Sequence, residues 1–590
     1  MAQFVGTRID IDGTNIAQFS SLTISQSIFE HHSFRLICPT EAIDGTQGIL
    51  NSSRNMIGGT IKIQIQVVGG NGTLQFAGVV TQVEASRSSG HAGDIIISGY
   101  SPTILLDNGP HCQTWEKKAV RNIAQDVLSQ FPQNLLQPKI TPSYGETLSY
   151  TVQYKETAWQ FLSRIAATYG EWFFYDGVKL VLGPPQGDKI KMTYGSDLRS
   201  FNMALQVRPT NFQAKAYDYM NYQVYDGEPS GIADKAGLND LGKYTLQKSQ
   251  QFYSATPKQW HNNFLTNKKQ LDDYVNARAA MQSSNMVRFN GNSGDPGVQV
   301  GGGISVQGKN VFSQSDESFG DYTVVSAHHH CDGHGHYSND FVAIPSTVKM
   351  PPVPGYPEPH SETQSAIVTD NNDPKGLGRV RVKYHWMTDS EKTPWLRVTT
   401  PHAGGGKGLF LIPEIGEEVI VGFEGNSGTK PYIIGSVYHG SAKNSFANAG
   451  NDVKTLQSRS GTKVVLNDNE GSVNVEDKDG NNMVMDGAGN INVTSKESIV
   501  LTCGDARLEM KKDGTINVNG KTITHTASEN ATMVSGGASF SADGKKNEAS
   551  VGSNKTTVSG NAEAHFNGAK TTVSATGKCA VQGAIVALNL

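Results

Sequence analysis

The stretch "TKVVLNDNEGSVNVEDKDGNNMVMDGAGNINV", from Thr462 to Val493, sets the pattern that decides how the last third of the chain folds. Apolar residues come in alternating pairs, successive pairs begin 8 to 10 residues apart, and Gly, Asn or Asp usually falls between them. Because side chains alternate along a strand, each pair predicts a short strand with one apolar face, followed by a tight bend. The pairs are Val464 and Leu466, Val473 and Val475, Met483 and Met485, Ile491 and Val493, Ile499 and Leu501, Leu508 and Met510, and Ile516 and Val518.

A narrow ribbon of such strands has no core of its own. Isolated strands and hairpins are marginal in water, so the apolar face needs something to cover it. One solution is a solenoid wound from a single chain, and another is three copies wound around a common axis as a triangular prism. From His439 onward there is no Pro, Trp or Tyr, and the short repeat with small inward residues favours the trimer. We therefore predict an intertwined trimeric β-helix over residues 441–590, whose regular pattern fades after about Thr526.

The region before this ribbon, residues 363–440, contains five short strand patterns separated by turn residues. This arrangement is typical of a small Greek-key barrel of the oligonucleotide/oligosaccharide-binding (OB) type. A linker over residues 351–362 precedes it, and the five prolines between Met350 and His360 make that linker stiff and extended. The predicted strands lie at Ile367, Arg379 to Trp386, Trp395 to Thr399, Glu418 to Phe423 and Tyr432 to Tyr438.

Residues 1–350 mix strands, short helices and turns. Helical spacing of apolar residues predicts a helix that begins after the N-cap Thr157 and stops at Gly170. Turns at Gly69 to Gly72 and at Asp176-Gly177 predict β-hairpins. We predict a mainly β hub made of two barrel units that flank a smaller α/β insertion at about 110–200, while the stretch from Gln250 to Gly303 matches no pattern sharply.

Composition narrows the class of partner. The formal net charge is -4 and the sequence pI is about 6.5, which argues against a surface that collects nucleic acid. The five cysteines are odd in number, scattered and without a CxxC pair, which fits folding in a reducing cytosol. The first residues, "MAQFVGTRIDIDGTN", carry no readable export signal, and no window of 18 uninterrupted apolar residues predicts a membrane span.

A histidine-rich stretch, "AHHHCDGHGHY" from Ala327 to Tyr337, raises the question of a metal site. If the turn had two residues, at Asp332-Gly333, His329 would face His336 and Cys331 would face His334, which is four possible ligands on one sheet face. A longer turn through Gly335 would separate them. We expect a structural or solvated hairpin tip there, with no metal and no cofactor.

Two further stretches invite a functional interpretation. "HAGGGKGLF", from His402 to Phe410, resembles a phosphate-binding loop, but Gly408 follows Lys407 where Ser or Thr is needed, and no helix signal follows. We expect a turn of the barrel. His525 has the same strand parity as Ile523, so three copies could hold an ion or water on a trimer axis, although a solvated or packed histidine is the commoner outcome. No Ser-His-Asp or Cys-His set shows motif spacing, and we expect no enzyme activity.

The order of these regions and four segments resemble the VgrG family, the spike proteins of type VI secretion, which are related to the hub and spike of contractile phage tails. The segments are "VQYKETAWQFLSRIAATYGEWFFYDG", "GLGRVRVKYHW", "TPWLRVTTPHAGGGKGLFLIPEIGEEVIVGFEGN" and "PYIIGSVYHG". The resemblance implies a homotrimer in which residues 1–350 form the hub, the OB barrel a collar and the last region a needle.

The resemblance also implies partners. Two similar barrels per chain would give the trimer a pseudo-sixfold face that seats on a hexameric tube of Hcp-type protein. Baseplate components would surround the hub, and effector proteins would travel with the spike through a target membrane that it contacts only transiently. A PAAR-repeat protein would cap the needle, and the apolar residues Ala584, Ile585, Val586, Ala587 and Leu588 are the predicted docking surface, with packing among three chain ends as the alternative. Assembly in the bacterial cytoplasm and export through the apparatus, without a signal peptide, follow from this role.

Two other functions compete with this interpretation. One is a spike with a fused effector or lysozyme domain, but only about two dozen residues separate His439 from the first apolar pair at Val464, and nothing globular is predicted after the needle. The other is the spike of an extracellular, phage-tail-like contractile injection particle. Its chain would have the same physical properties.

Overall fold

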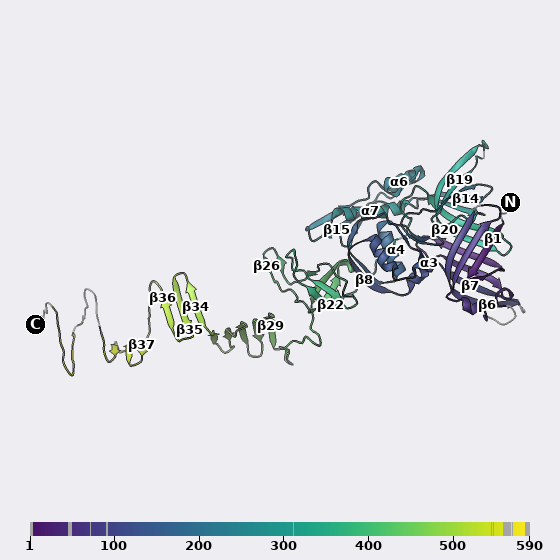
Figure 1. The fold of residues 1–590 in the computed structure, drawn as a ribbon. Coiled ribbons are helices and arrows are strands. Elements are labelled where there is room, and N and C mark those ends of the chain that lie inside the picture. Colours follow the sequence, from purple (N-terminus) through teal and green to yellow (C-terminus); the bar gives the residue numbers. More distant parts are fainter. Residues whose placement is uncertain are drawn as a thin grey trace. The chain divides into compact units, whose positions relative to one another are not determined.

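The computed structural model describes residues 4–44, 50–70, 72–89, 92–310, 312–353, 355–543, 545–546, 548–557, 568 and 570–583. Its residues divide into two compact units, Met1–Ala442 and Lys443–Leu590. Strands dominate both units, which confirms the mainly β class predicted from the sequence (Figure 1). No helix within the described part of the chain is both long and apolar enough to cross a membrane.

A large sheet forms most of the first unit. Its strand order is β14-β18-β21-β20-β3-β4-β7-β6-β5-β1-β2, and β19 pairs both β20 and β13. β20 pairs with both β3 and β21, so it joins an N-terminal half of the sheet to a second half. The strands are β1 Val5–Ile11, β2 Thr14–Asn15, β3 Ser21–Ser27, β4 Ser33–Pro39, β5 Thr60–Val67, β6 Thr73–Ser89, β7 Ala92–Tyr100, β13 Lys189–Thr193, β14 Leu198–Leu205, β18 Val287–Ser293, β19 Gly303–Lys309, β20 Asp316–Asp332 and β21 Tyr337–Pro345.

Each half of this sheet has its own core. Alternation in "TIKIQIQV" of β5 buries Ile61, Ile63 and Ile65 on one face, and the β5–β6 hairpin turns where Gly69 to Gly72 predicted it. The second half packs around Phe289, which has no exposed surface. Short helical segments lie along the N-terminal half at α1 Thr40–Ile43, η1 Ser53–Met56 and η2 Pro102–Asp107.

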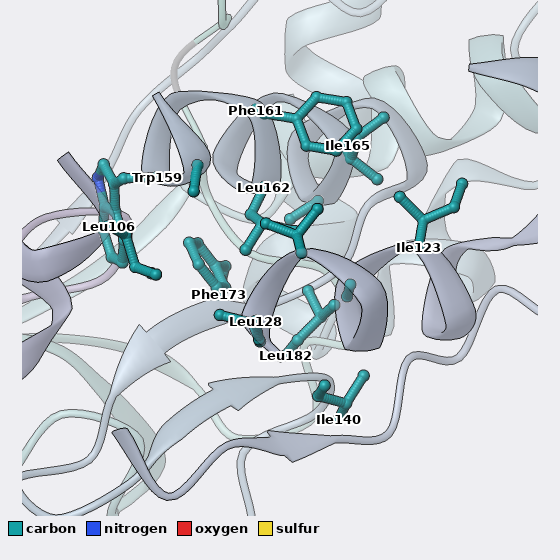
Figure 2. Close-up of a cluster of buried hydrophobic side chains, with 14 of the residues drawn as sticks. Leu106, Ile123, Leu128, Ile140, Trp159, Phe161, Leu162, Ile165, Phe173 and Leu182 are labelled. Atoms are coloured by element: carbon teal, nitrogen blue, oxygen red, sulfur yellow. The ribbon is translucent and has the colours of Figure 1, made fainter. Parts of the chain in front are cut away.

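The predicted α/β insertion packs helix α4 against short strands. Thr157 caps α4 in a capping box with Gln160, and Gly170 ends it in the left-handed region at φ 71, which confirms both predicted helix ends. Figure 2 shows how Trp159, Phe161, Leu162 and neighbouring apolar side chains fill the core of the insertion. The elements are β8 His111–Ala119, α2 Val120–Leu128, α3 Gln133–Leu136, β9 Lys139–Ile140, β10 Thr147–Glu156, α4 Ala158–Tyr169, β11 Phe173–Tyr175 and β12 Leu180–Leu182.

A second α/β segment, which the sequence did not predict, follows β14. In helix α7 the residues Leu271, Val275 and Ala279 recur every four positions and are buried, and the side chain of Asn267 accepts a hydrogen bond from the Gln270 N–H as N-cap. The elements are β15 Gln213–Asp218, β16 Gln223–Gly227, α5 Ile232–Ala236, α6 Asp240–Phe252, β17 Lys258–Trp260 and α7 Lys268–Ser283.

The barrel after the linker forms as predicted. Its five-stranded sheet has the order β23-β22-β27-β28-β24, and a bridge between Val380 and Leu396 joins the two ends of that order. Val382, Val419 and Ile433 are buried inside. The elements are β22 Gln364–Asp370, β23 Arg381–Tyr384, β24 Arg397–Val398, β25 Ala403–Gly404, β26 Lys407–Gly408, β27 Glu418–Phe423, η3 Glu424–Asn426 and β28 Pro431–Ser436.

The described residues of the second unit form short antiparallel strands in three separate sheets, β29 to β33, β34 to β36 and β37 to β39. Every apolar pair named above falls inside a strand, so the strand prediction is confirmed, and β37 to β39 continue the strands beyond Thr526. The strands are β29 Val453–Gln457, β30 Lys463–Asn467, β31 Ser472–Glu476, β32 Asn482–Met485, β33 Ile491–Thr494, β34 Ser498–Cys503, β35 Ala506–Lys511, β36 Ile516–Asn519, β37 Asn530–Ser535, β38 Ala538–Asp543 and β39 Glu548–Gly552.

Candidate functional site

The candidate site is the apolar face of the second unit, which we call the needle face. The strand register places apolar side chains opposite one another across each ladder: Val464 pairs with Val475, and Val475 pairs in turn with Met483. Directly opposed residues on one sheet face lie within contact distance. The remaining members of the face are Leu466, Val473, Met485, Ile491, Val493, Ile499, Leu501, Leu508, Met510, Ile516 and Val518.

The needle face is open to solvent within one chain. Leu466 keeps 45% of its surface exposed, Ile491 keeps 63% and Ile516 keeps 64%. In β5 of the first unit, the same alternation leaves Ile63 only 2% exposed. Contiguous apolar surface of this kind marks an interface in soluble proteins.

Tight turns fix the register of the needle strands. Asp477 Oδ1 accepts hydrogen bonds from the backbone N–H groups of Asp479 at 2.8 Å and Asn481 at 3.0 Å, and Asp486 captures two N–H groups in the same way. The hydrogen bond from the Asn481 side chain, with these backbone donors, lowers the pKa of Asp477. At Gly487 φ is +75 and an added Cβ would lie 2.1 Å from the Glu470 carbonyl oxygen, so this turn requires glycine.

The histidine-rich hairpin has the longer of the two turns considered from its sequence. β20 and β21 pair Cys331 with Tyr337 and His329 with Asn339, so the turn passes through Gly335 and the register that would gather four ligands does not form. Asp332 sets this longer turn, because its Oδ1 accepts from the His334 and His336 backbone N–H groups, both at 2.9 Å.

The four candidate ligands therefore go to different surroundings. His329 is buried, with Nδ1 2.6 Å from Tyr337 Oη, and burial lowers its pKa to about 3. Cys331 is buried beside Thr7, whereas the His336 ring binds Asp332 at 2.7 Å in solvent and the backbone of His334 lies in the turn. Among the described residues, no three His, Cys, Asp or Glu side chains gather closely enough to hold a metal ion.

The remaining sequence candidates are simpler. The glycine-rich stretch forms the small β25–β26 hairpin, with Gly408 in the left-handed half of the map at φ 127. His525 is exposed, in a segment without regular structure. The predicted tip residues Ala584, Ile585, Val586, Ala587 and Leu588 lie outside the described residues.

One polar constellation that the sequence did not reveal joins a hydroxyl, an imidazole and a carboxylate. His31 Nδ1 lies 2.8 Å from Thr103 Oγ1, and His31 Nε2 lies 2.8 Å from Asp107 Oδ2. Thr103 is fully buried, so its hydroxyl cannot attack a bound molecule. Burial lowers the pKa of His31, against the opposing effect of Asp107. Because Asp107 also accepts a hydrogen bond from Thr157, the set ties the start of α4 to the sheet.

Two family models match the chain. Residues 50–334 match the phage tail baseplate hub model, and residues 364–438 match the model of the type VI secretion system/phage-baseplate injector OB domain. The second match covers the barrel whose strands are described above.

Several known proteins with similar sequences are named as spike proteins. The type VI secretion system spike protein VgrG1a of Pseudomonas aeruginosa is 23% identical over 585 residues, with 82% of this chain and 86% of that protein covered. VgrG1c of the same organism, also named as a spike protein, is 23% identical over 476 residues, with 72% of this chain covered. The chain spans only 61% of the length of VgrG1c.

A solved structure shares the fold. A chain of the Francisella PdpA-VgrG complex in its lidded form has a TM-score of 0.52 at 10% sequence identity, and the match covers 88% of this chain and 80% of that chain.

Proposed function

The chain is a member of the VgrG family of spike proteins, and from this premise we propose that it is the trimeric puncturing spike of a type VI secretion apparatus. The observation that supports the trimer is the needle face. Its apolar side chains line up across successive strands, yet no described residue of the same unit buries them. Burial of apolar surface contributes roughly 25 cal/mol per Å², so three such ribbons gain a shared core when they wind together.

The work of such a spike is mechanical. Interwound strands separate only when many ladder hydrogen bonds break together, each worth about 1 kcal/mol net. The short ladders of the needle, reinforced by the Asp477 and Asp486 turns, suit a rod that transmits force. We propose no catalytic step, and the buried Thr103 constellation has a structural role.

The proposed partners follow from the family. The hub would seat on a hexameric tube of Hcp-type protein within the baseplate, and effector proteins would travel on the spike. A PAAR-repeat protein would cap the end that carries Ala584 to Leu588. The protein would assemble in the bacterial cytoplasm and leave through the apparatus, reaching the target membrane only during contraction.

Light scattering on the purified full chain tests the trimer. We expect a mass three times the 63.5 kDa of one chain, and a clear loss of trimer when the chain is truncated at Asn451. A monomeric full chain would contradict the proposal. Co-purification with Hcp-type and PAAR-repeat proteins tests the two docking ends separately. The double substitution Ile585→Asp/Val586→Asp should abolish binding of the PAAR-repeat protein and leave binding of the Hcp-type protein unchanged.

A further inference from the structure

The barrel at residues 363–440 makes charged contacts with the hub that neither the fold nor the proposed role requires. The proline-rich linker alone would leave the barrel free to pivot. From the contacts described below, we infer that two sets of polar contacts, which we call clamps, hold the barrel in a fixed position on the hub. The linker is then a fixed connection rather than a hinge.

The first clamp lies on β8 of the α/β insertion. Arg381 of β23 donates from both terminal nitrogens to Glu116, at 3.1 and 3.0 Å, and each side chain is 20% exposed. A third bond runs from Arg381 to the Thr393 carbonyl at 3.0 Å, and the guanidinium lies 5.2 Å from the centre of the Trp395 ring. A two-point arginine–carboxylate pair fixes orientation as well as distance.

A second carboxylate strengthens this clamp. Glu391 Oε1 of the barrel accepts hydrogen bonds from the backbone N–H of Thr114 at 2.7 Å and from its hydroxyl at 3.2 Å. Its other oxygen accepts from the Thr388 N–H at 2.7 Å, inside the barrel. Thr114 is buried, so a single carboxylate joins a buried hub strand to a barrel loop.

The second clamp holds Tyr219, which follows β15 of the second α/β segment. Arg379 Nη1 donates to Tyr219 Oη at 3.3 Å, and the Arg397 guanidinium lies 4.6 Å from the centre of the tyrosine ring. Asp373 fixes Arg379 through two bonds of 2.9 and 2.7 Å, and both of these side chains are almost fully buried. Tyr219 therefore contacts two arginines of the barrel, and Asp373 holds one of them, Arg379, in position.

The linker itself is hydrogen-bonded to the hub and to the barrel. Tyr356 Oη donates to the Phe29 carbonyl at 3.2 Å, and the Ser361 N–H donates to the Asn426 carbonyl of the barrel at 3.0 Å. The linker is thus held to the hub by a side chain and to the barrel by its backbone, and the Ser361 N–H is freed only when the barrel moves away. Force applied to the hub would then be transmitted directly to the barrel of the same chain. This transmission would not depend on the oligomeric state.

Hydrogen–deuterium exchange of the full chain tests this inference. We expect Glu116→Arg and Arg381→Glu each to raise exchange of the Ser361 N–H, measured in a peptide over residues 355–362, by about tenfold, because each leaves a partly buried charge facing its like. The double swap Glu116→Arg/Arg381→Glu restores an opposite pair, so exchange should return to within about threefold of the unaltered chain. Glu391→Gln, which keeps shape and weakens the bonds to Thr114, should raise exchange by about threefold.

The matched control is the Lys155–Glu362 ion pair, which also joins hub to linker but is 57% and 59% exposed. Lys155→Glu should change exchange by less than twofold, since exposed pairs contribute little. Circular dichroism and light scattering establish that each variant folds and assembles. Unchanged exchange in both single reversals and in Glu391→Gln would overturn the inference, as would a double swap that exchanges faster than either single variant.

Discussion

The two units share the same alternation of apolar and polar residues, but the apolar face is buried in the first unit and exposed in the second. In β5 of the first unit, Ile61, Ile63 and Ile65 turn toward a core that other strands of the same chain complete. In β33 of the second unit, Ile491 and Val493 alternate in the same way, yet both remain more than half exposed. The pattern therefore specifies a strand and its apolar face, but the covering surface comes from the rest of the chain in one unit and, in our proposal, from other copies in the other.

The sharpest way to break this comparison is to charge the needle face. Val475→Asp combined with Met483→Asp places two opposed carboxylates inside the proposed shared core, where unpaired charge is strongly disfavoured. We expect complete loss of the trimer by light scattering. Asn492→Asp, between Ile491 and Val493 on the other face of β33, is the matched control and should leave the mass unchanged. A trimer that survives the double substitution would show that the face is not the interface.

The hub core should respond in the opposite way, through stability rather than assembly. Phe289 has no exposed surface and lies 5.1 Å from Phe201 and 4.5 Å from Tyr322, measured between ring centres. Phe289→Ala should lower the free energy of unfolding by about 3–5 kcal/mol, with a midpoint that does not depend on protein concentration. Phe312→Ala, at a residue that is 96% exposed, serves as the control with almost no effect. A concentration-dependent loss for Phe289→Ala would contradict the self-contained core.

Needle turns provide a finer comparison between steric and conformational cost. Gly487→Ala introduces a Cβ 2.1 Å from the Glu470 carbonyl oxygen at a positive φ, and should destabilise the needle by about 2 kcal/mol. Gly504→Ala has positive φ but open space around it, so it should cost about 1 kcal/mol. Thermal unfolding of the trimer measures both. Equal effects would mean that the close approach to Glu470 does not constrain the turn.

Acid should loosen the hub through His329. Burial lowers its pKa to about 3 from an ordinary value of 6.5, so the unfolded chain binds a proton that the folded chain excludes. Stability is therefore present above pH 6.5 and falls as the pH drops toward 3, by about 1.4 kcal/mol per pH unit for one proton. His329→Gln should make this fall shallower in denaturant titrations at pH 7, 6 and 5. Two other buried histidines, His32 with a pKa lowered to about 3 and His261 with a pKa lowered to about 4, contribute to the slope that remains.

The smallest expected effect concerns a helix end that the sequence already predicted. Thr157→Ala removes the cap of α4 and should cost about 1 kcal/mol in the hub, measured by chemical unfolding. Thr157→Ser keeps both the cap and the donor to Asp107, and should behave like the unaltered chain. A loss with Ser as large as that with Ala would assign the effect to packing of the methyl group instead.

The sequence predicted correctly those elements whose formation depends on residues only a few positions apart. The needle strands, the α4 helix and the barrel strands follow from periodicity, caps and turn residues that act over a few positions. The sequence left two turn lengths open for the histidine hairpin, and the longer one forms because Asp332 accepts hydrogen bonds from the N–H groups of His334 and His336. Helix α7 was missed although Asn267 is a visible N-cap, because three of its six buried apolar residues are small alanines.

Contacts between distant parts of the chain could not be predicted at all. The Arg381–Glu116 pair joins residues 265 positions apart, and neither residue belongs to a motif that marks it as a contact. The same holds for the relation between His31, Thr103 and Asp107, which are brought together when β4 pairs with β7.

The order of the two units along the chain has a consequence for biosynthesis. The ribosome completes the hub and barrel, whose cores are internal, before it releases the needle face. The needle face therefore emerges on a chain whose hub and barrel are already folded, which shortens the time in which it can bind apolar surfaces of unfolded segments. Chains made by neighbouring ribosomes on one messenger RNA would be the nearest source of the two other needle faces. Trimer formation and aggregation would therefore compete as soon as each chain is released.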